Sequence, residues 1–488
     1  MKKIIKTVFF VTSISVFTRL LGFFFRIYLS RTIGAESLGL YQISMSIVAL
    51  LATFTAGLPL TLSRKTSECI ASRDIKSNSS LVSSTLTIGL IVCTILFVTA
   101  HLLEPYIGNI FSDQQCKPIF YILLPTIFTT CIISTIRSWF WGQKKFLVFS
   151  LTEMVEEISR IVLGVLIINQ IIFSFEQVDG TAISFVVSDV LCTIMMIIVF
   201  FSLGGVLSKP NDIKPIISAS TPITGVRLYS SLVQSLIATI LPSMLISIGL
   251  SSSEALSDYG RLMGMAIPIL YAPAALTGSI AVVLVPEAAS DRISGNIKGL
   301  KDKVERSINV SILFACLFYI IFVPFGEQIG EILYSDSVAG RYISYSAILM
   351  LPLNINQITT SLLNSIAEEK KTLLHYAIGS IFLIASILIL PKYVGVMSLT
   401  IGMTLCFSVT SILNLLTLRK KINISFGYVF TILFFFIGGG LSIYLGQFMM
   451  NILISVVPTL IALIGGGVMA LTMFLLSSYL MGYYDIIK

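Results

Sequence analysis

The sequence has few charged residues and almost no histidine, and each shortage excludes a class of protein. Only 11% of the 488 residues are charged, whereas a soluble domain of this length carries roughly a quarter. With only His101 and His375 present, a histidine-based metal or catalytic centre is not expected. The seven cysteines form no Cys-x-x-Cys pair and lie mostly in apolar runs, which indicates buried free thiols. We therefore expect no metal and no cofactor.

Hydrophobic residues make up 56% of the sequence, and many of them lie in long apolar runs. Windows of about 20 apolar residues, the length of a helix that crosses a bilayer, predict about fourteen transmembrane helices. These predicted spans lie near 7–31, 40–63, 80–103, 118–139, 152–172, 181–203, 222–249, 259–286, 307–325, 341–366, 372–390, 394–418, 427–449 and 453–482. The connections are too short for a soluble domain, so the fold class is an all-α polytopic membrane protein.

Basic residues concentrate in alternate loops between the predicted spans. One side of the membrane receives most lysines and arginines, whereas the other receives only Arg31, Lys117, Arg341 and Lys392. Because positively charged loops remain in the cytoplasm, this alternation places both termini there. The net charge of +8 is spread over these loops rather than gathered in one tract, so nucleic acid is not an expected partner.

Two short patterns recur in the same order, six predicted spans apart. Residues 36–41 resemble residues 254–259, and Leu-Pro at 124–125 recurs at 351–352. Such repeats indicate a duplicated six-span unit, and an even number of spans gives parallel repeats that enclose a central cavity. The expected organisation is a first lobe at 1–203, a second lobe at 204–421 and two additional helices at 422–488.

When the residues assigned to loops are subtracted, including Arg31 and Arg341 at span ends, six basic residues are left within the predicted spans. All are arginine: Arg19, Arg26, Arg137, Arg160, Arg227 and Arg261. The planar guanidinium suits bidentate recognition of phosphate or carboxylate better than the ammonium group of lysine does. Arg19 and Arg26 are two helical turns apart, so they project from one helix face. No acid on their own helix pairs with them. We expect them to bind an anion, with a structural pair to another helix, for instance to Asp189, as the alternative.

Local explanations are available for three of the other arginines. Arg137 and Arg227 lie near the predicted cytoplasmic ends of their spans, where such side chains extend to the interface. Arg160 lies one turn from Glu156 and Glu157, so an ion pair within the helix is expected.

Span 8 has features of a bending helix. Arg261 opens it beside Asp258 and Tyr259, where interfacial anchoring is the alternative to a binding role. Pro268 and Pro273 follow in the same span, and proline weakens or kinks a helix. Prolines are also common in membrane helices generally.

Polar residues in two other spans have more than one interpretation. Asp189 is the only acid well inside the hydrocarbon depth, and it could be an arginine partner, a proton or cation site, or a packing group. Span 10 contains three candidates for lining a polar cavity, which are Asn354, Asn356 and Gln357. The alternative is that these side chains form hydrogen bonds between helices. No Walker loop, His-Glu-x-x-His or paired-carboxylate motif occurs in an accessible segment, so an enzyme is not expected.

Three stretches resemble one known family. TRLLGFFFRIYLSRTIGAESLGLYQ at 18–42, GLPLTLSRKTSE at 57–68 and DYGRLMGMAIPILYAPAALTGSIAVVLVPEAA at 258–289 are similar to the polysaccharide-transporter branch of the multidrug/oligosaccharidyl-lipid/polysaccharide flippase superfamily. The resemblance implies a MATE-like fold of two six-helix lobes plus two C-terminal helices. It also implies that Arg19, Arg26, Arg64 and Arg261 hold the diphosphate of a lipid-linked substrate in a central cavity.

The resemblance implies a transporter in a bacterial plasma membrane. The expected partners are an undecaprenyl-diphosphate-linked saccharide, membrane lipids and cell-wall synthesis enzymes. The expected activity is movement of the peptidoglycan precursor lipid II by alternating access, for spore cortex synthesis. The alternatives are a flippase for another lipid-linked polysaccharide, a MATE-type drug exporter, a membrane glycosyltransferase and a non-transporting scaffold. The drug exporters carry an acid in the first span, which this chain lacks.

Overall fold

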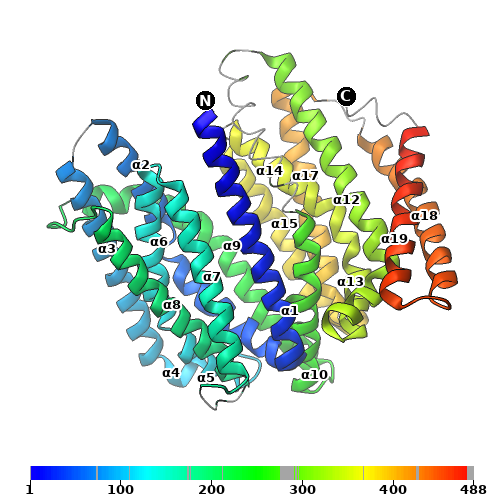
Figure 1. Ribbon diagram of the computed structural model, residues 1–488, viewed down its shortest axis with the longest axis horizontal. Helices are drawn as coiled ribbons and strands as arrows, with labels where there is room; N and C mark the ends of the chain where they lie inside the picture. The colour runs from blue at the N-terminus through cyan, green and yellow to red at the C-terminus, as the bar shows by residue number, and fades with distance from the viewer. Residues whose placement is uncertain are drawn as a thin grey trace. The chain divides into compact units, whose positions relative to one another are not determined.

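The computed structural model describes residues 2–72, 75–108, 110–172, 175, 177–211, 213–274, 278, 291, 294, 296–366, 368–424 and 428–480. Every regular element in these residues is a helix, which confirms the all-α class (Figure 1). Nine helices in the described ranges are long and apolar enough to cross a membrane. The count of fourteen remains a prediction, and the spans near 259–286, 427–449 and 453–482 extend beyond the described residues.

The chain divides into two compact units. The first unit is formed by residues 1–243 and 251–260, and the second by residues 244–250 and 261–488. The lobe boundaries expected at 203 and 421 remain predictions.

The first unit consists of helices that pack side by side. Its elements are α1 (Lys2–Thr53), α2 (Gly57–Ser72), α3 (Ile75–Leu102), α4 (Glu104–Ile107), α5 (Cys116–Leu123), α6 (Thr126–Gly142), α7 (Phe146–Ile168), α8 (Gln177–Ser202), most of α9 (Ile213–Ser247) and α10 (Ser252–Tyr259). Helix α1 packs against α7, and α7 packs against α8. This arrangement brings three helices together around the site described below.

Glycine and proline interrupt the first unit's helices at two places. Helix α1 kinks at Gly34, whose φ of +78° is a conformation that side chains rarely adopt. The predicted fourth span is divided into α5 and α6 at Leu124 and Pro125, because proline lacks the N–H that continues a helix. The kink at Gly34 leads the chain from the first predicted span directly into the second.

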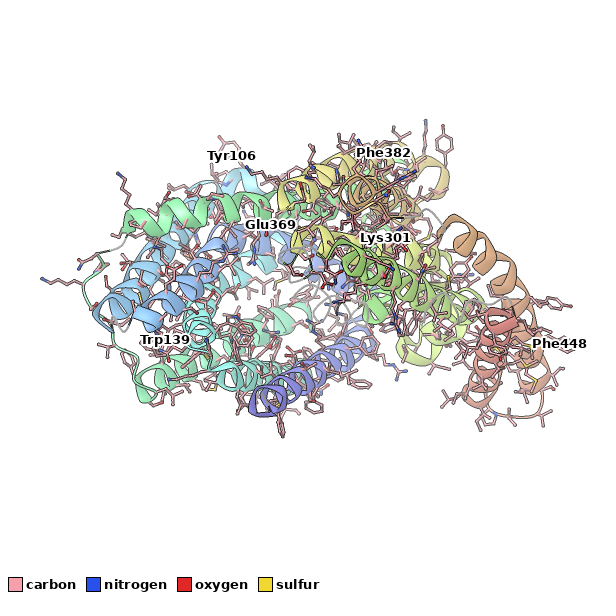
Figure 2. The ribbon with its side chains drawn as sticks, turned by 90° about the horizontal axis from the view of Figure 1, so that it is seen from above. Tyr106, Trp139, Lys301, Glu369, Phe382 and Phe448 are labelled. Carbon is pink, nitrogen blue, oxygen red and sulfur yellow. The ribbon has the colours of Figure 1, made fainter. Side chains whose placement is uncertain are left out.

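An aromatic cluster packs α6 against α8 in the first unit. The ring of Trp139 meets the ring of Phe200 edge to face, with centroids 4.8 Å apart. The ammonium group of Lys145 lies 5.4 Å from the centre of the Trp139 ring and donates a hydrogen bond to the carbonyl of Leu203. Trp139 is labelled among the side chains of this unit in Figure 2. These contacts hold α8 in the position that presents its polar face to α7.

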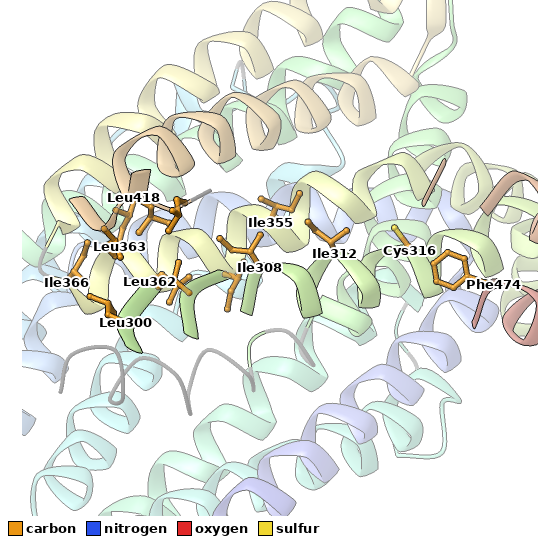
Figure 3. Packing of buried hydrophobic residues seen from close by; sticks show 14 of the residues in the cluster. Leu300, Ile308, Ile312, Cys316, Ile355, Leu362, Leu363, Ile366, Leu418 and Phe474 are labelled. Atoms are coloured by element: carbon orange, nitrogen blue, oxygen red, sulfur yellow. The ribbon is translucent and has the colours of Figure 1, made fainter. Parts of the chain in front are cut away.

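The second unit is built around one long helix, α12 (Ile297–Tyr334). The other elements are η1 (Gly260–Ala266, which begins in the first unit), α13 (Ser337–Ser346), η2 (Ala347–Leu349), α14 (Met350–Ser365), α15 (Glu369–Ile389), α16 (Pro391–Val394), α17 (Met397–Ile422), α18 (Tyr428–Leu453) and α19 (Thr459–Leu480). Figure 3 shows part of its core, where Ile308 and Ile312 of α12 face Ile355 and Leu362 of α14.

Residues 260–266 form a π-helical turn, and an α-helical segment continues to residue 274. The wide turn ends just before Pro268. Proline removes one N–H and collides with the carbonyl four residues earlier, so a wide turn ahead of it relieves both problems. The irregularity expected in span 8 is therefore present at Gly260–Ala266, and whether this helix bends during function remains a prediction.

Candidate functional site

A cavity of about 110 Å³ lies within the first unit, between α1, α7 and α8. Helix α1 contributes from both sides of its kink, because residues before and after Gly34 reach the cavity. The lining combines two guanidinium groups, hydroxyl and amide groups, and apolar side chains. Its residues are Gly22, Phe25, Arg26, Leu29, Leu38, Tyr41, Gln42, Arg160, Thr181, Ser184 and Phe185.

Arg26 is the cavity residue whose charge is available for a ligand. Among the described residues, no hydrogen bond or ion pair engages its guanidinium, which is half-buried. Its positive charge acts through space on Tyr41 and on Glu157. A guanidinium that borders a cavity without a direct partner can bind an anion with planar oxygens.

Two hydroxyl groups of the cavity, those of Thr181 and Ser184, are oriented as acceptors. Thr181 donates its hydroxyl hydrogen to the carbonyl of Gln177 at 2.8 Å, and Ser184 donates to the carbonyl of Thr181 at 2.8 Å. Their oxygen lone pairs are left for a ligand that brings its own donors, such as a sugar hydroxyl. The amide of Gln42 can donate and accept. The cavity therefore pairs one available cationic group, that of Arg26, with several acceptors.

Arg160, the second cavity arginine, is held by three carboxylates. It donates to Glu156 Oε1 at 2.8 Å, to Glu157 Oε2 at 3.0 Å and to Asp189 Oδ1 at 3.2 Å. Its guanidinium carbon also lies 4.4 Å from the centre of the Phe185 ring. The pairs expected within α7 are confirmed, and Asp189 of α8 is an additional partner from another helix.

Arg137 joins the same network from α6. Its Nη2 lies 2.6 Å from Glu156 Oε2, and its side chain is only 14% exposed. The expectation that it extends to the interface was wrong, because Glu156 on the neighbouring helix α7 offers it an opposite charge inside the protein. Together with Arg26, the network balances three arginines against three carboxylates, those of Glu156, Glu157 and Asp189.

Helix α1 approaches the network at Gly22, one turn before Arg26. A Cβ at this position would lie 2.9 Å from Glu157 Oε1, which is closer than real Cβ contacts. The absence of a side chain therefore allows the carboxylate of Glu157 to lie directly against α1. This approach places Glu157 within electrostatic reach of Arg26.

The other predicted diphosphate ligands do not line this cavity. Arg19 is exposed on α1, and Arg64 is exposed on α2. Arg261 belongs to the second unit, where its Nε donates to Asp336 Oδ2 at 2.7 Å. Asp336 also caps α13 by accepting from the backbone of Ala339. Their roles in substrate binding remain predictions.

The predicted cavity candidates of span 10 lie on α14. Asn354 is buried and donates to the carbonyl of Met350 at 2.7 Å. Asn356 accepts a hydrogen bond from Thr360 at 3.4 Å, and the Gln357 amide lies beside Gly278. Pro268 and Pro273 are in the helical segment after the π-helical turn, and Pro273 is buried. The cavity-lining and bending roles of these residues remain predictions.

Sequence reasoning missed the polar wall of the cavity. Thr181 and Ser184 are three residues apart on one face of α8, and Tyr41 and Gln42 follow the kink of α1. The spacing of Thr181, Ser184 and Ser188 is the available signal, because it gives α8 a polar stripe within an apolar helix.

Residues 4–290 match the family described as "Polysaccharide biosynthesis protein". Two proteins of Bacillus subtilis (strain 168) are similar to the chain. Stage V sporulation protein B is 21% identical over 424 residues, which cover 84% of this chain and 82% of the relative. Sporulation protein YkvU is 22% identical over 357 residues, which cover 70% of this chain and 78% of the relative.

Solved structures of membrane transporters share the fold. The lipid II flippase MurJ in an inward closed conformation has a TM-score of 0.76 at 16% identity, covering 98% of this chain and all of that one. An inward-facing multidrug resistance MATE family transporter of the MOP superfamily has a TM-score of 0.64 at 19% identity. The match covers 83% of this chain and 94% of that one. The MATE-like fold and the resemblance noted from the sequence are confirmed. The protein is a multi-pass membrane protein.

Proposed function

We propose that this chain, which belongs to the polysaccharide biosynthesis protein family, is a flippase that moves a lipid-linked saccharide across the plasma membrane. The observation that carries the proposal is the position of Arg26, half-buried beside a cavity and engaged by no direct partner among the described residues. An arginine within a membrane helix costs about 2.5–3.5 kcal/mol on insertion scales. An anionic ligand would offset this cost.

The diphosphate of a polyprenyl-linked saccharide is the anion that fits best. Its oxygens can accept two parallel hydrogen bonds from one guanidinium, which a lysine could not donate. The sugar would place hydroxyl donors against the acceptor oxygens of Thr181 and Ser184. The lipid tail would remain in the bilayer. Arg19, Arg64 and Arg261 remain members of the proposed diphosphate-binding set, from the family resemblance.

The proposed mechanism is alternating access. The substrate enters from the cytoplasmic leaflet, and movement of the two lobes opens the site to the other side. The charge pattern of the loops supports cytoplasmic positions for both termini. The chain acts as a transporter and not as an enzyme. The site offers groups that can bind a ligand, and its three acids are engaged in ion pairs with Arg160 rather than presented as catalytic groups.

Within this function, we propose lipid II as the substrate and spore cortex synthesis as the role. Two similar proteins support this proposal, since one relative is stage V sporulation protein B and one structural neighbour is the lipid II flippase MurJ. Cell-wall synthesis enzymes are the proposed partners. The test is complementation of a strain depleted of its lipid II flippase. Growth supports lipid II as substrate; failure to grow, with normal membrane levels of the protein, contradicts it.

The lipid that co-purifies with the chain separates the remaining alternatives. A different undecaprenyl-diphosphate-linked saccharide would indicate a flippase for another polysaccharide. A MATE-type drug exporter would retain no such lipid and would confer drug resistance on a sensitive strain. A membrane glycosyltransferase would lengthen a glycan in vitro. A non-transporting scaffold would tolerate replacement of Arg26 without loss of function.

A further inference from the structure

Two carboxylates of the network have partners that a ligand in the cavity would not remove. Glu156 is paired with Arg160 at 2.8 Å and with Arg137 at 2.6 Å. Asp189 is paired with Arg160 at 3.2 Å, and the hydroxyl of Thr129 lies 3.5 Å from its second oxygen. Glu156 therefore has two ion pairs, and Asp189 has one ion pair and one neutral polar partner. Arg137 and Thr129 do not line the cavity.

Glu157 differs, because its second positive charge comes from the proposed ligand-binding residue. It is paired with Arg160 at 3.0 Å. Its other oxygen lies against Gly22, and the next turn of α1 carries Arg26, whose charge acts on this carboxylate. An anion bound to Arg26 would neutralise that charge. Glu157 would then share Arg160 with two other carboxylates.

We propose that Glu157 takes up one proton from water when the anion of the transported lipid binds Arg26, and that it releases the proton when the anion leaves. The proton forms an O–H bond on a carboxylate oxygen of Glu157, and no other bond changes. This inference rests on the proposed function. It gives the transporter a second ligand, because a proton accompanies the anion and lowers by one the negative charge of the occupied site.

The groups around Glu157 make it the acid that titrates with ligand binding. Glu153, Glu156 and Arg160 face it from α7, and Arg26 and Tyr41 face it from α1. Beyond Arg160 lie Asp189 of α8 and Arg137 of α6. Arginine remains protonated throughout the physiological range. Neutralising a carboxylate next to a new negative charge removes repulsion that is strong away from bulk water.

The test uses titration calorimetry on the full chain in nanodiscs, with farnesyl diphosphate as the probe. Measuring the binding heat in two buffers of different ionisation enthalpy gives the number of protons taken up. We expect Glu157→Gln to bind the probe with about one proton fewer than the wild type. Protons exchanged by the diphosphate itself cancel in this difference. Glu153→Gln, which removes an acid one turn away on α7, is the matched control and retains the uptake.

The outcomes separate the two proposals. Equal proton uptake by the wild type and Glu157→Gln overturns this inference and leaves the diphosphate site intact. Equal binding by the wild type and Arg26→Ala, or no binding by either, overturns the proposed site as well. Gly22→Ala covers the case in which Glu157→Gln fails to fold, because its Cβ displaces the carboxylate. Unchanged uptake in Gly22→Ala would also contradict the inference.

Discussion

The carboxylate of Glu157 lies so close to Gly22 that a Cβ at position 22 would be 2.9 Å from Oε1. Helix propensity alone favours alanine over glycine by about 1 kcal/mol. Glycine at this position therefore has a local reason, which is the approach of an acid from α7 to the turn that precedes Arg26. The contact links the helix of the proposed anion ligand to the ion-pair network.

The first prediction concerns this contact. Gly22→Ala should leave the thermal unfolding midpoint nearly unchanged, because the colliding atom is the end of a flexible side chain that can move. Transport should nevertheless fall, because the displaced carboxylate no longer faces Arg26. Gly225→Ala, where the new methyl group meets nothing within 4 Å, is the control for both measurements. Loss of stability together with transport would contradict this interpretation.

The second prediction ranks the members of the network by stability. Removing one partner of a buried ion pair costs about 3–5 kcal/mol in soluble proteins. Arg160→Ala should lower the unfolding midpoint most, because it leaves three carboxylates without their shared partner. Asp189→Asn removes one of the three negative charges around Arg160 and should cost less. A midpoint for Asp189→Asn below that of Arg160→Ala would show that the network is organised differently.

The third prediction concerns the packing of α10 on α1. A Cβ at Gly39 would overlap the carbonyl of Leu256, and one at Gly260 would overlap the carbonyl of Ala35. Because backbone atoms cannot move aside as a side chain can, Gly39→Ala and Gly260→Ala should each cost about 1–3 kcal/mol. Unfolding midpoints measure the effect, again against Gly225→Ala. Wild-type midpoints for both variants would refute the close approach.

The fourth prediction concerns pH and the cytoplasmic ends proposed for α15 and α17. Hydrogen bonds from Lys421 at 2.7 Å and Lys371 at 3.1 Å hold the pKa of Glu368 below its ordinary value. The unfolded carboxyl protonates near its ordinary pKa of about 4.3, so this stabilisation is complete above that pH and disappears as pH falls further. Glu368→Gln should reduce the acid dependence of the unfolding midpoint, whereas Glu369→Gln should not. Parallel acid profiles for the wild type and Glu368→Gln would contradict the prediction.

Local patterns in the sequence account for much of the fold and for part of the site. Apolar runs locate the helices, and the spacing of Glu156, Glu157 and Arg160 predicts their pairing, because both depend on positions within one helix. The partners from other helices could not be predicted. Arg137 reaches Glu156 and Asp189 reaches Arg160 only because α6, α7 and α8 pack together. The sequence alone allows Asp189 to pair with Arg19 or Arg26, whereas helix packing pairs it with Arg160.

The cavity illustrates the same limit. Arg26 was a candidate from the sequence because an unpaired arginine in an apolar helix needs a partner. Its neighbours Tyr41 and Gln42 come from beyond the kink at Gly34, and Thr181 and Ser184 come from α8. No periodicity in α1 indicates that these residues meet, since their proximity depends on the angle of the kink and on inter-helix packing.

The most direct test of the proposed function is a flipping assay in proteoliposomes that contain an undecaprenyl-diphosphate-linked saccharide. Arg26→Ala should reduce the rate at least about tenfold, because a hydrogen bond to a charged group contributes about 1.5–3 kcal/mol. Arg26→Lys keeps the positive charge but lacks the planar guanidinium. Its flipping rate should lie between those of the wild type and Arg26→Ala. Arg31→Ala removes an exposed arginine from the same helix and should flip at the wild-type rate. Wild-type flipping by Arg26→Ala, at an equal protein level in the vesicles, would contradict the account.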